Sequence, residues 1–145
     1  MSDAVSDSIV VEADPDMVMD VIADFEAYPE WQDEIKEVEV LARDNDGWGT
    51  EVRYVVDAKI FSMTYVLAYT YDDDAMHWTL VEGDQVRKID GTYRLEEQGD
   101  GTTLVIYDLE VVPAISLPKM VRRQAAKRIV DSALKGMKRR VESKT

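Results

Sequence analysis

Residues 115–145 contain ten of the chain's 17 basic residues, in a stretch that predicts one long helix. This segment has a net charge of about +8, against about −21 for the 114 residues before it. Its apolar and small side chains recur at every fourth residue, which predicts a stripe along one helix face: Leu117, Val121, Ala125, Ile129, Ala133 and Met137. Such a stripe needs an apolar surface to cover, and the opposite charges favour packing on the acidic remainder.

The region from Ile35 to Val112 predicts six antiparallel strands separated by turns rich in Asp, Gly and Asn. Alternate residues in these strands are apolar or aromatic, so they share one face of the sheet. The predicted inner face comprises Val52, Tyr54, Val56, Phe61, Met63, Tyr65, Leu67, Tyr69, Met76, Trp78, Leu80, Ile89, Gly91, Tyr93, Leu95, Val105, Tyr107, Leu109 and Val111.

A seventh strand is predicted near the N-terminus, over residues 8–12. Asp14 followed by Pro15 predicts the start of a short helix, because aspartate is a good N-cap and proline suits the first helical position. Pro29 should end this helical region within a compact aromatic turn. The chain is therefore expected to be an α+β protein in which a seven-stranded sheet packs on one long C-terminal helix.

Composition narrows the possible functions. The length of 145 residues predicts one domain spanning residues 1–145. The net charge of −13 argues against nucleic acid as a partner. No apolar run is long enough for stable membrane insertion, although the basic helix could contact an acidic membrane surface transiently. The acidic N-terminal residues lack a secretory pattern, so a cytoplasmic location is expected. The sequence leaves the oligomeric state open.

The inner face predicts a cavity. Six of its residues are tyrosine or tryptophan, whose polar atoms need hydrogen-bond partners when buried. Small residues on the helix, including Ala125, Ala133 and Gly136, suggest room between helix and sheet. The alternative is a filled core in which the tyrosine hydroxyls reach solvent at the sheet ends.

Two segments carry a resemblance to a known superfamily. Residues 13–31 with 37–41, and residues 91–96 with 101–107 and 113–118, resemble the START/Bet v 1-like (SRPBCC) superfamily, in the branch of polyketide cyclases/dehydrases and lipid transport proteins. Coenzyme Q-binding proteins have a similar opening pattern. The resemblance implies a helix-grip fold, in which a seven-stranded antiparallel sheet wraps around the C-terminal helix. It also implies a cavity for lipids, polyketides or quinone-like molecules.

The first functional hypothesis is therefore a non-catalytic binder or carrier of a small hydrophobic ligand. A polyketide cyclase/dehydrase with the same cavity, and an interaction protein with a vestigial cavity, remain alternatives. His77 is the single histidine and is expected on the outer face, so no catalytic residue, metal site or cofactor is predicted. The predicted ligand-binding residues are Trp31, Tyr54, Met63, Tyr65, Tyr69, Trp78, Tyr93, Tyr107, Val121, Ala125 and Ile129.

Overall fold

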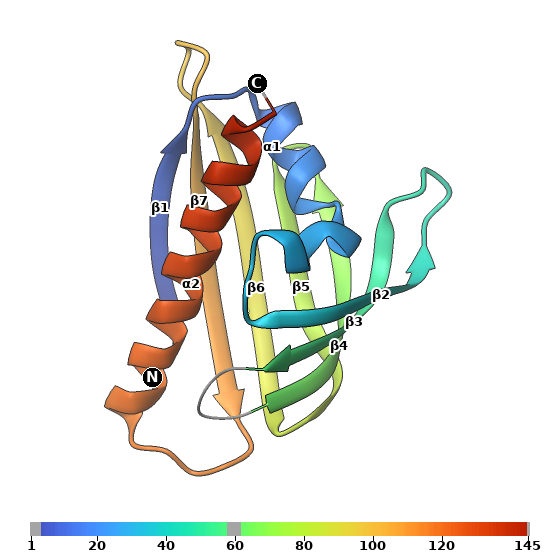
Figure 1. The fold of residues 1–145 in the computed structure, drawn as a ribbon, viewed down its shortest axis with the longest axis vertical. Coiled ribbons are helices and arrows are strands. Elements are labelled where there is room, and N and C mark those ends of the chain that lie inside the picture. Colours follow the sequence, from blue (N-terminus) through green and yellow to red (C-terminus); the bar gives the residue numbers. More distant parts are fainter. Residues whose placement is uncertain (1–3, 58–61, 145) are drawn as a thin grey trace.

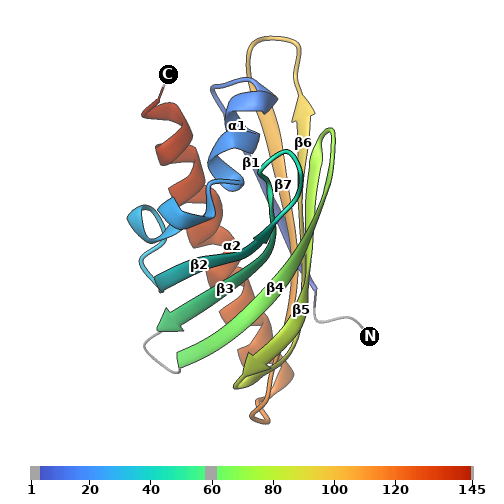
Figure 2. The same cartoon turned by 90° about the vertical axis from the view of Figure 1, so that its right-hand side faces the viewer.

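The computed structural model describes residues 4–57 and 62–144. A seven-stranded antiparallel sheet curves around a long C-terminal helix (Figures 1 and 2). The strands lie in the order β1-β7-β6-β5-β4-β3-β2, so the first strand pairs with the last and the other six form a meander. Their bounds are β1 Val5–Val11, β2 Ile35–Arg43, β3 Gly49–Asp57, β4 Ser62–Asp72, β5 Ala75–Asp84, β6 Val86–Glu97 and β7 Thr103–Pro113.

Two short helical segments follow β1. Helix α1 (Pro15–Ile22) begins as predicted, with Pro15 at the first helical position and the Asp14 carboxylate accepting a hydrogen bond from the Met17 amide. A 3₁₀ helix, η1 (Phe25–Glu30), comes next and contains Pro29. These segments close one end of the space between the sheet and α2 (Lys119–Glu142) (Figure 2).

The predicted alternation along the strands is confirmed for the described residues. Val52, Tyr54 and Val56 are buried on β3, and Val105, Tyr107 and Leu109 are buried on β7. Outward residues form ion pairs across strands, as Lys88 does with Glu110 at 2.8 Å. Phe61 was expected on the inner face and lies outside the described residues.

The predicted helix stripe is wrong in its N-terminal half. Val121 is 42% exposed and Ala125 is half-buried, whereas Ala133 and Met137 are buried. Four residues advance a helix by about 40° more than one full turn, so a strict four-residue spacing winds around the axis. The buried face follows a mixture of three- and four-residue steps instead: Ala126, Val130, Ala133, Leu134, Met137 and Val141.

Candidate ligand-binding cavity

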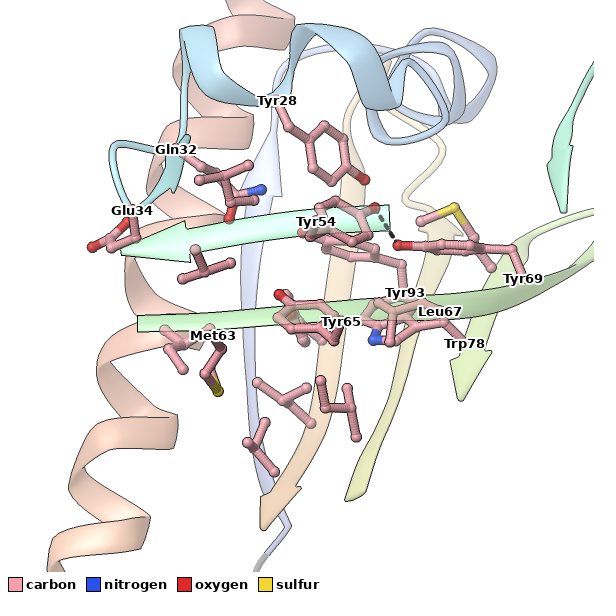
Figure 3. Close-up of a pocket in the computed structure, with 18 residues that line it drawn as sticks. Tyr28, Gln32, Glu34, Tyr54, Met63, Tyr65, Leu67, Tyr69, Trp78 and Tyr93 are labelled. Atoms are coloured by element: carbon pink, nitrogen blue, oxygen red, sulfur yellow. Dashed lines mark hydrogen bonds between the residues drawn. The ribbon is translucent and has the colours of Figure 1, made fainter. Parts of the chain in front are cut away.

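A cavity of about 100 Å³ lies between the inner face of the sheet, the segment around η1 and the middle of α2. Figure 3 shows Gln32 and Glu34 at one end of its lining and Tyr69 and Trp78 at the other. Strands β3 to β7 supply most of the lining, and α2 supplies Ile129. The lining residues are Tyr28, Gln32, Glu34, Ile35, Tyr54, Val56, Met63, Tyr65, Leu67, Tyr69, Met76, Trp78, Ile89, Tyr93, Tyr107, Leu109, Val111 and Ile129.

The aromatic lining residues form one continuous group. Tyr69 contacts Trp78 with ring centroids 5.8 Å apart, and Trp78 contacts Tyr93 at 5.4 Å and Tyr107 at 5.6 Å. The ring of Tyr54 lies 5.4 Å from that of Tyr65. Neighbouring rings in tilted or edge-on arrangements hold one another in place, so the cavity wall is stiff and largely apolar.

The tyrosine hydroxyls differ in how they are satisfied. The hydroxyls of Tyr54 and Tyr69 share a hydrogen bond of 2.5 Å, and that of Tyr28 donates to the Ile22 carbonyl oxygen. Within the described part of the chain, the hydroxyls of Tyr65, Tyr93 and Tyr107 have no hydrogen-bond partner. Half of the cavity's phenols therefore retain hydrogen-bonding capacity for another molecule.

Burial keeps these phenols protonated. Desolvation raises the pKa of Tyr54, Tyr69 and Tyr93 well above the usual value of 10.0, and the charges of neighbouring tyrosinates would raise it further, although the hydrogen bond from Tyr69 partly lowers the pKa of Tyr54. Burial likewise raises the pKa of Tyr65 and Tyr107. At neutral pH each hydroxyl is consequently both a donor and an acceptor and carries no charge.

Glu34 is the lining residue with an ionisable carboxyl group. It is half-buried, as is Gln32, and both precede β2 in the loop after η1. No lysine, arginine or histidine is among the lining residues that the structure describes. The electrostatic character of the cavity is thus neutral over the sheet and acidic at the Gln32–Glu34 end.

The structure brings together eight of the residues predicted to bind ligand: Tyr54, Met63, Tyr65, Tyr69, Trp78, Tyr93, Tyr107 and Ile129. Trp31, Val121 and Ala125 are outside the lining. Trp31 instead packs on α2, where a Cβ atom at Gly136 would come 2.4 Å from the Trp31 carbonyl oxygen. Gly136 therefore makes room for Trp31, at the end of η1, rather than for a ligand.

Some lining residues were missed by sequence reasoning. Gln32 and Glu34 belong to an irregular segment, which has no periodic signal to assign a face. The alternation did place six further lining residues on the predicted inner face, although they were not among the predicted ligand-binding residues: Val56, Leu67, Met76, Ile89, Leu109 and Val111.

His77 lies on the outer face of the sheet, as expected from its register beside Trp78. Its Nδ1 atom is 2.8 Å from the Thr92 hydroxyl oxygen, and its Nε2 atom is 3.6 Å from the Asp90 carboxylate. Among the described residues, no group of three or more His, Cys, Asp or Glu could hold a metal ion. Nor is any helix in residues 4–57 and 62–144 long and apolar enough to cross a membrane.

Comparison with known proteins supports this architecture. Residues 11–138 match the family described as polyketide cyclase/dehydrase and lipid transport. A START superfamily protein from Mycobacterium smegmatis is 29% identical, with a TM-score of 0.91 over 98% of this chain and 99% of that one. The Zhui aromatase/cyclase from Streptomyces sp. R1128 is 18% identical, with a TM-score of 0.79 over 96% and 93% of the two chains. No curated protein matches the sequence.

Proposed function

The chain belongs to the polyketide cyclase/dehydrase and lipid transport family, and we propose that it binds a small, neutral, largely apolar molecule bearing hydroxyl or keto groups. The observation that carries this proposal is the set of three cavity hydroxyls without a partner among the described residues, on Tyr65, Tyr93 and Tyr107. Each of these hydroxyls can donate one hydrogen bond to the oxygen atoms of a ligand and can accept others. An apolar wall with a few oriented polar groups is typical of small-molecule sites.

The cavity volume limits the size of the ligand. Pockets for drug-sized ligands enclose roughly 300–1,000 Å³, whereas this cavity measures about 100 Å³. A whole lipid or a full-length polyketide would need side chains to move. A planar molecule of one or two rings suits the space and the aromatic wall better, because it can stack on rings such as Trp78.

Glu34 limits the charge of the ligand. A carboxylate or phosphate on the ligand would be repelled by this carboxylate at the Gln32–Glu34 end, and no described lining residue is a cation that could offset the repulsion. The protein's net charge of −13 opposes anions as well. Phenols, ketones and quinones lack this penalty, so they are expected to bind in preference to fatty acids.

A matched pair of ligands tests the proposal. Calorimetric titration at neutral pH should show binding of 2-naphthol, and binding of 2-naphthoate should be at least about tenfold weaker. The Glu34→Gln variant should narrow that difference, since it removes the charge and keeps the shape. If neither compound binds, the proposal that the cavity takes a small aromatic ligand is wrong. If naphthoate binds as tightly as naphthol, only the charge selection is wrong.

Two variants of α2 test the location. Ile129→Phe adds bulk to a residue that lines the cavity, whereas Ala125→Phe adds the same ring one turn earlier, outside the lining. The first should abolish 2-naphthol binding, and the second should retain it. Equal behaviour of the two variants would show that the ligand binds elsewhere.

Cyclisation or dehydration of a polyketone is a second candidate function. Protonated phenols facing one cavity could donate hydrogen bonds to a ketone oxygen and stabilise a developing enolate. Glu34 is the lining group that could accept a proton. Incubation with a short poly-β-ketone distinguishes the candidates, because an enzyme changes the distribution of products and its Ile129→Phe variant does not. If the wild-type protein does not change the distribution of products, ligand binding without catalysis is the remaining candidate function.

A further inference from the structure

The start of α2 and the loop before it form an exposed apolar surface. Met120 is 72% exposed, Ile115 is 47% exposed and Val121 is 42% exposed. Figure 1 shows this loop and the first turns of α2 together at one end of the molecule, next to the end of β7. These three residues are half of the large apolar side chains that are exposed in the described part of the chain. Their clustering distinguishes them from scattered surface apolar residues.

Basic side chains surround these apolar residues. Residues 111–130 contain five lysines and arginines and no aspartate or glutamate, in a chain whose net charge is −13. Met120 and Lys127 are two turns apart on the same side of α2, and so are Val121 and Arg128. Met120 and Val121 therefore each have a basic residue two turns further along the same side of α2.

The two halves of α2 use their cations differently. In the C-terminal half, Lys135, Lys138 and Arg140 pair with Asp131, Glu142 and Glu30 at 3.1, 2.6 and 3.0 Å. In the N-terminal half, Lys119, Lys127 and Arg128 make no hydrogen bond or ion pair with any described residue. No side chain caps the N-terminus of this helix, so its positive dipole end adds to the same field.

We propose that residues 115–128 form a docking surface for a bilayer containing anionic phospholipid. Met120, Val121 and Ile115 would enter the boundary between headgroups and acyl chains, and Lys127 and Arg128 would contact lipid phosphates. Amphipathic helices with basic residues beside an apolar face bind membranes in this way. Within the described protein, these apolar side chains are exposed and these cations have no anionic partner. A bilayer supplies both an apolar layer and anionic groups for them.

The acidic remainder of the protein does not cancel this attraction. At about 0.1 M salt, charges are screened over about 10 Å, so a membrane senses mainly the charges nearest to it. The β5–β6 turn contacts the loop through a hydrogen bond of 3.0 Å from the Ala114 amide to the Gln85 carbonyl oxygen, and Asp84 is the adjacent acid. Lys119, Lys127 and Arg128, which form no ion pair with a described residue, are among the charges that a membrane at this end would sense.

Vesicle flotation with the full-length protein tests the proposal. The wild-type protein should float with vesicles of phosphatidylcholine containing about 30% phosphatidylserine and should bind pure phosphatidylcholine far more weakly. Neutralising two surface cations in Lys127→Gln/Arg128→Gln should weaken binding about 25-fold, from about fivefold for each cation. Met120→Ser should weaken it several-fold. Lys135→Gln/Arg139→Gln is the matched control with the same change in charge, and it should bind like wild type.

Several outcomes would overturn the proposal. These are no flotation of the wild-type protein with the anionic vesicles, equal binding to both vesicle types, or equal loss in the two double variants. A change of oligomeric state in Met120→Ser without vesicles would assign the surface to contact between copies of the chain instead. Because the substituted side chains are exposed, unchanged thermal midpoints should accompany every variant.

Discussion

The indole ring of Trp78 lies over Gly91, which faces it directly on the neighbouring strand. A Cβ atom at position 91 would come 2.2 Å from Cε2 of the ring, far inside van der Waals contact. Glycine is therefore required for Trp78 to lie against the sheet. The ring's position in turn sets how much of the cavity stays open, because Trp78 lines it.

Gly91→Ala should push the Trp78 ring into the cavity. We expect a loss of about 1–3 kcal/mol in the free energy of unfolding and weaker ligand binding, because the core is overpacked. Urea unfolding of Gly91→Ala, Trp78→Phe and the double variant forms a cycle that isolates the contact. The smaller phenyl ring should relieve the clash. If the losses of stability in Gly91→Ala and Trp78→Phe simply add in the double variant, the proposed clash between a side chain at position 91 and the Trp78 ring is contradicted.

Gly136→Ala should destabilise the protein, although the same change usually stabilises a helix by about 0.5–1 kcal/mol. The new Cβ atom would lie 2.4 Å from the backbone oxygen of Trp31, and a backbone atom cannot turn away as a side chain can. We expect a net loss of about 1–3 kcal/mol in thermal or urea unfolding. Ser132→Ala on the same helix is the control and should have little effect. A rise in stability for Gly136→Ala would refute the close contact.

Tyr54→Phe and Tyr69→Phe should each cost about 1–3 kcal/mol of stability, because each leaves the other hydroxyl buried without its 2.5 Å partner. The double variant should cost clearly less than the sum of the two, since no orphaned hydroxyl remains. Chemical unfolding of all three variants measures this coupling. Tyr65→Phe is a useful control, because its hydroxyl has no partner among the described residues.

Stability should fall steeply at alkaline pH. Burial raises the pKa of Tyr54, Tyr69 and Tyr93 above the value of 10.0 that applies to the unfolded chain. Above pH 10 the unfolded state therefore releases protons that the folded state retains, and unfolding becomes easier. Each such tyrosine contributes a decrease of about 1.4 kcal/mol per pH unit in this range and none below it. Urea unfolding between about pH 8 and 11 measures the slope. Tyrosinate absorbance from these residues should appear only as the protein unfolds.

Much of the fold was predictable because it depends on local patterns. The alternation on β3 and β7 fixed which side chains face inward, and Asp14 with Pro15 marked the start of α1. The predicted helix-grip architecture is confirmed by the seven-stranded order and by the likeness to the START superfamily protein from Mycobacterium smegmatis.

The register of α2 and the size of the cavity were not predictable in the same way. A stripe at every fourth residue fits a helix over two turns but not over six, so Val121 and Ala125 were misplaced. The small residue Gly136 suggested empty space, yet Trp31 occupies it. Cavity volume depends on how side chains from separate elements meet, and a sequence pattern records only which face they share.

The pairing of β1 with β7 has a consequence for how the chain folds. Val11 lies opposite Thr103, so β1 is synthesised about ninety residues before β7, the strand with which it pairs in the described sheet. The hairpins from β2 to β7 join strands adjacent in the sequence and can form while synthesis continues, whereas β1 must wait. In refolding experiments with pulsed hydrogen exchange, amides of β1 and α2 should gain protection together, after those of β4 to β6. The N-terminal strand of a nascent chain is accordingly an exposed segment that a chaperone could hold until the last strand emerges.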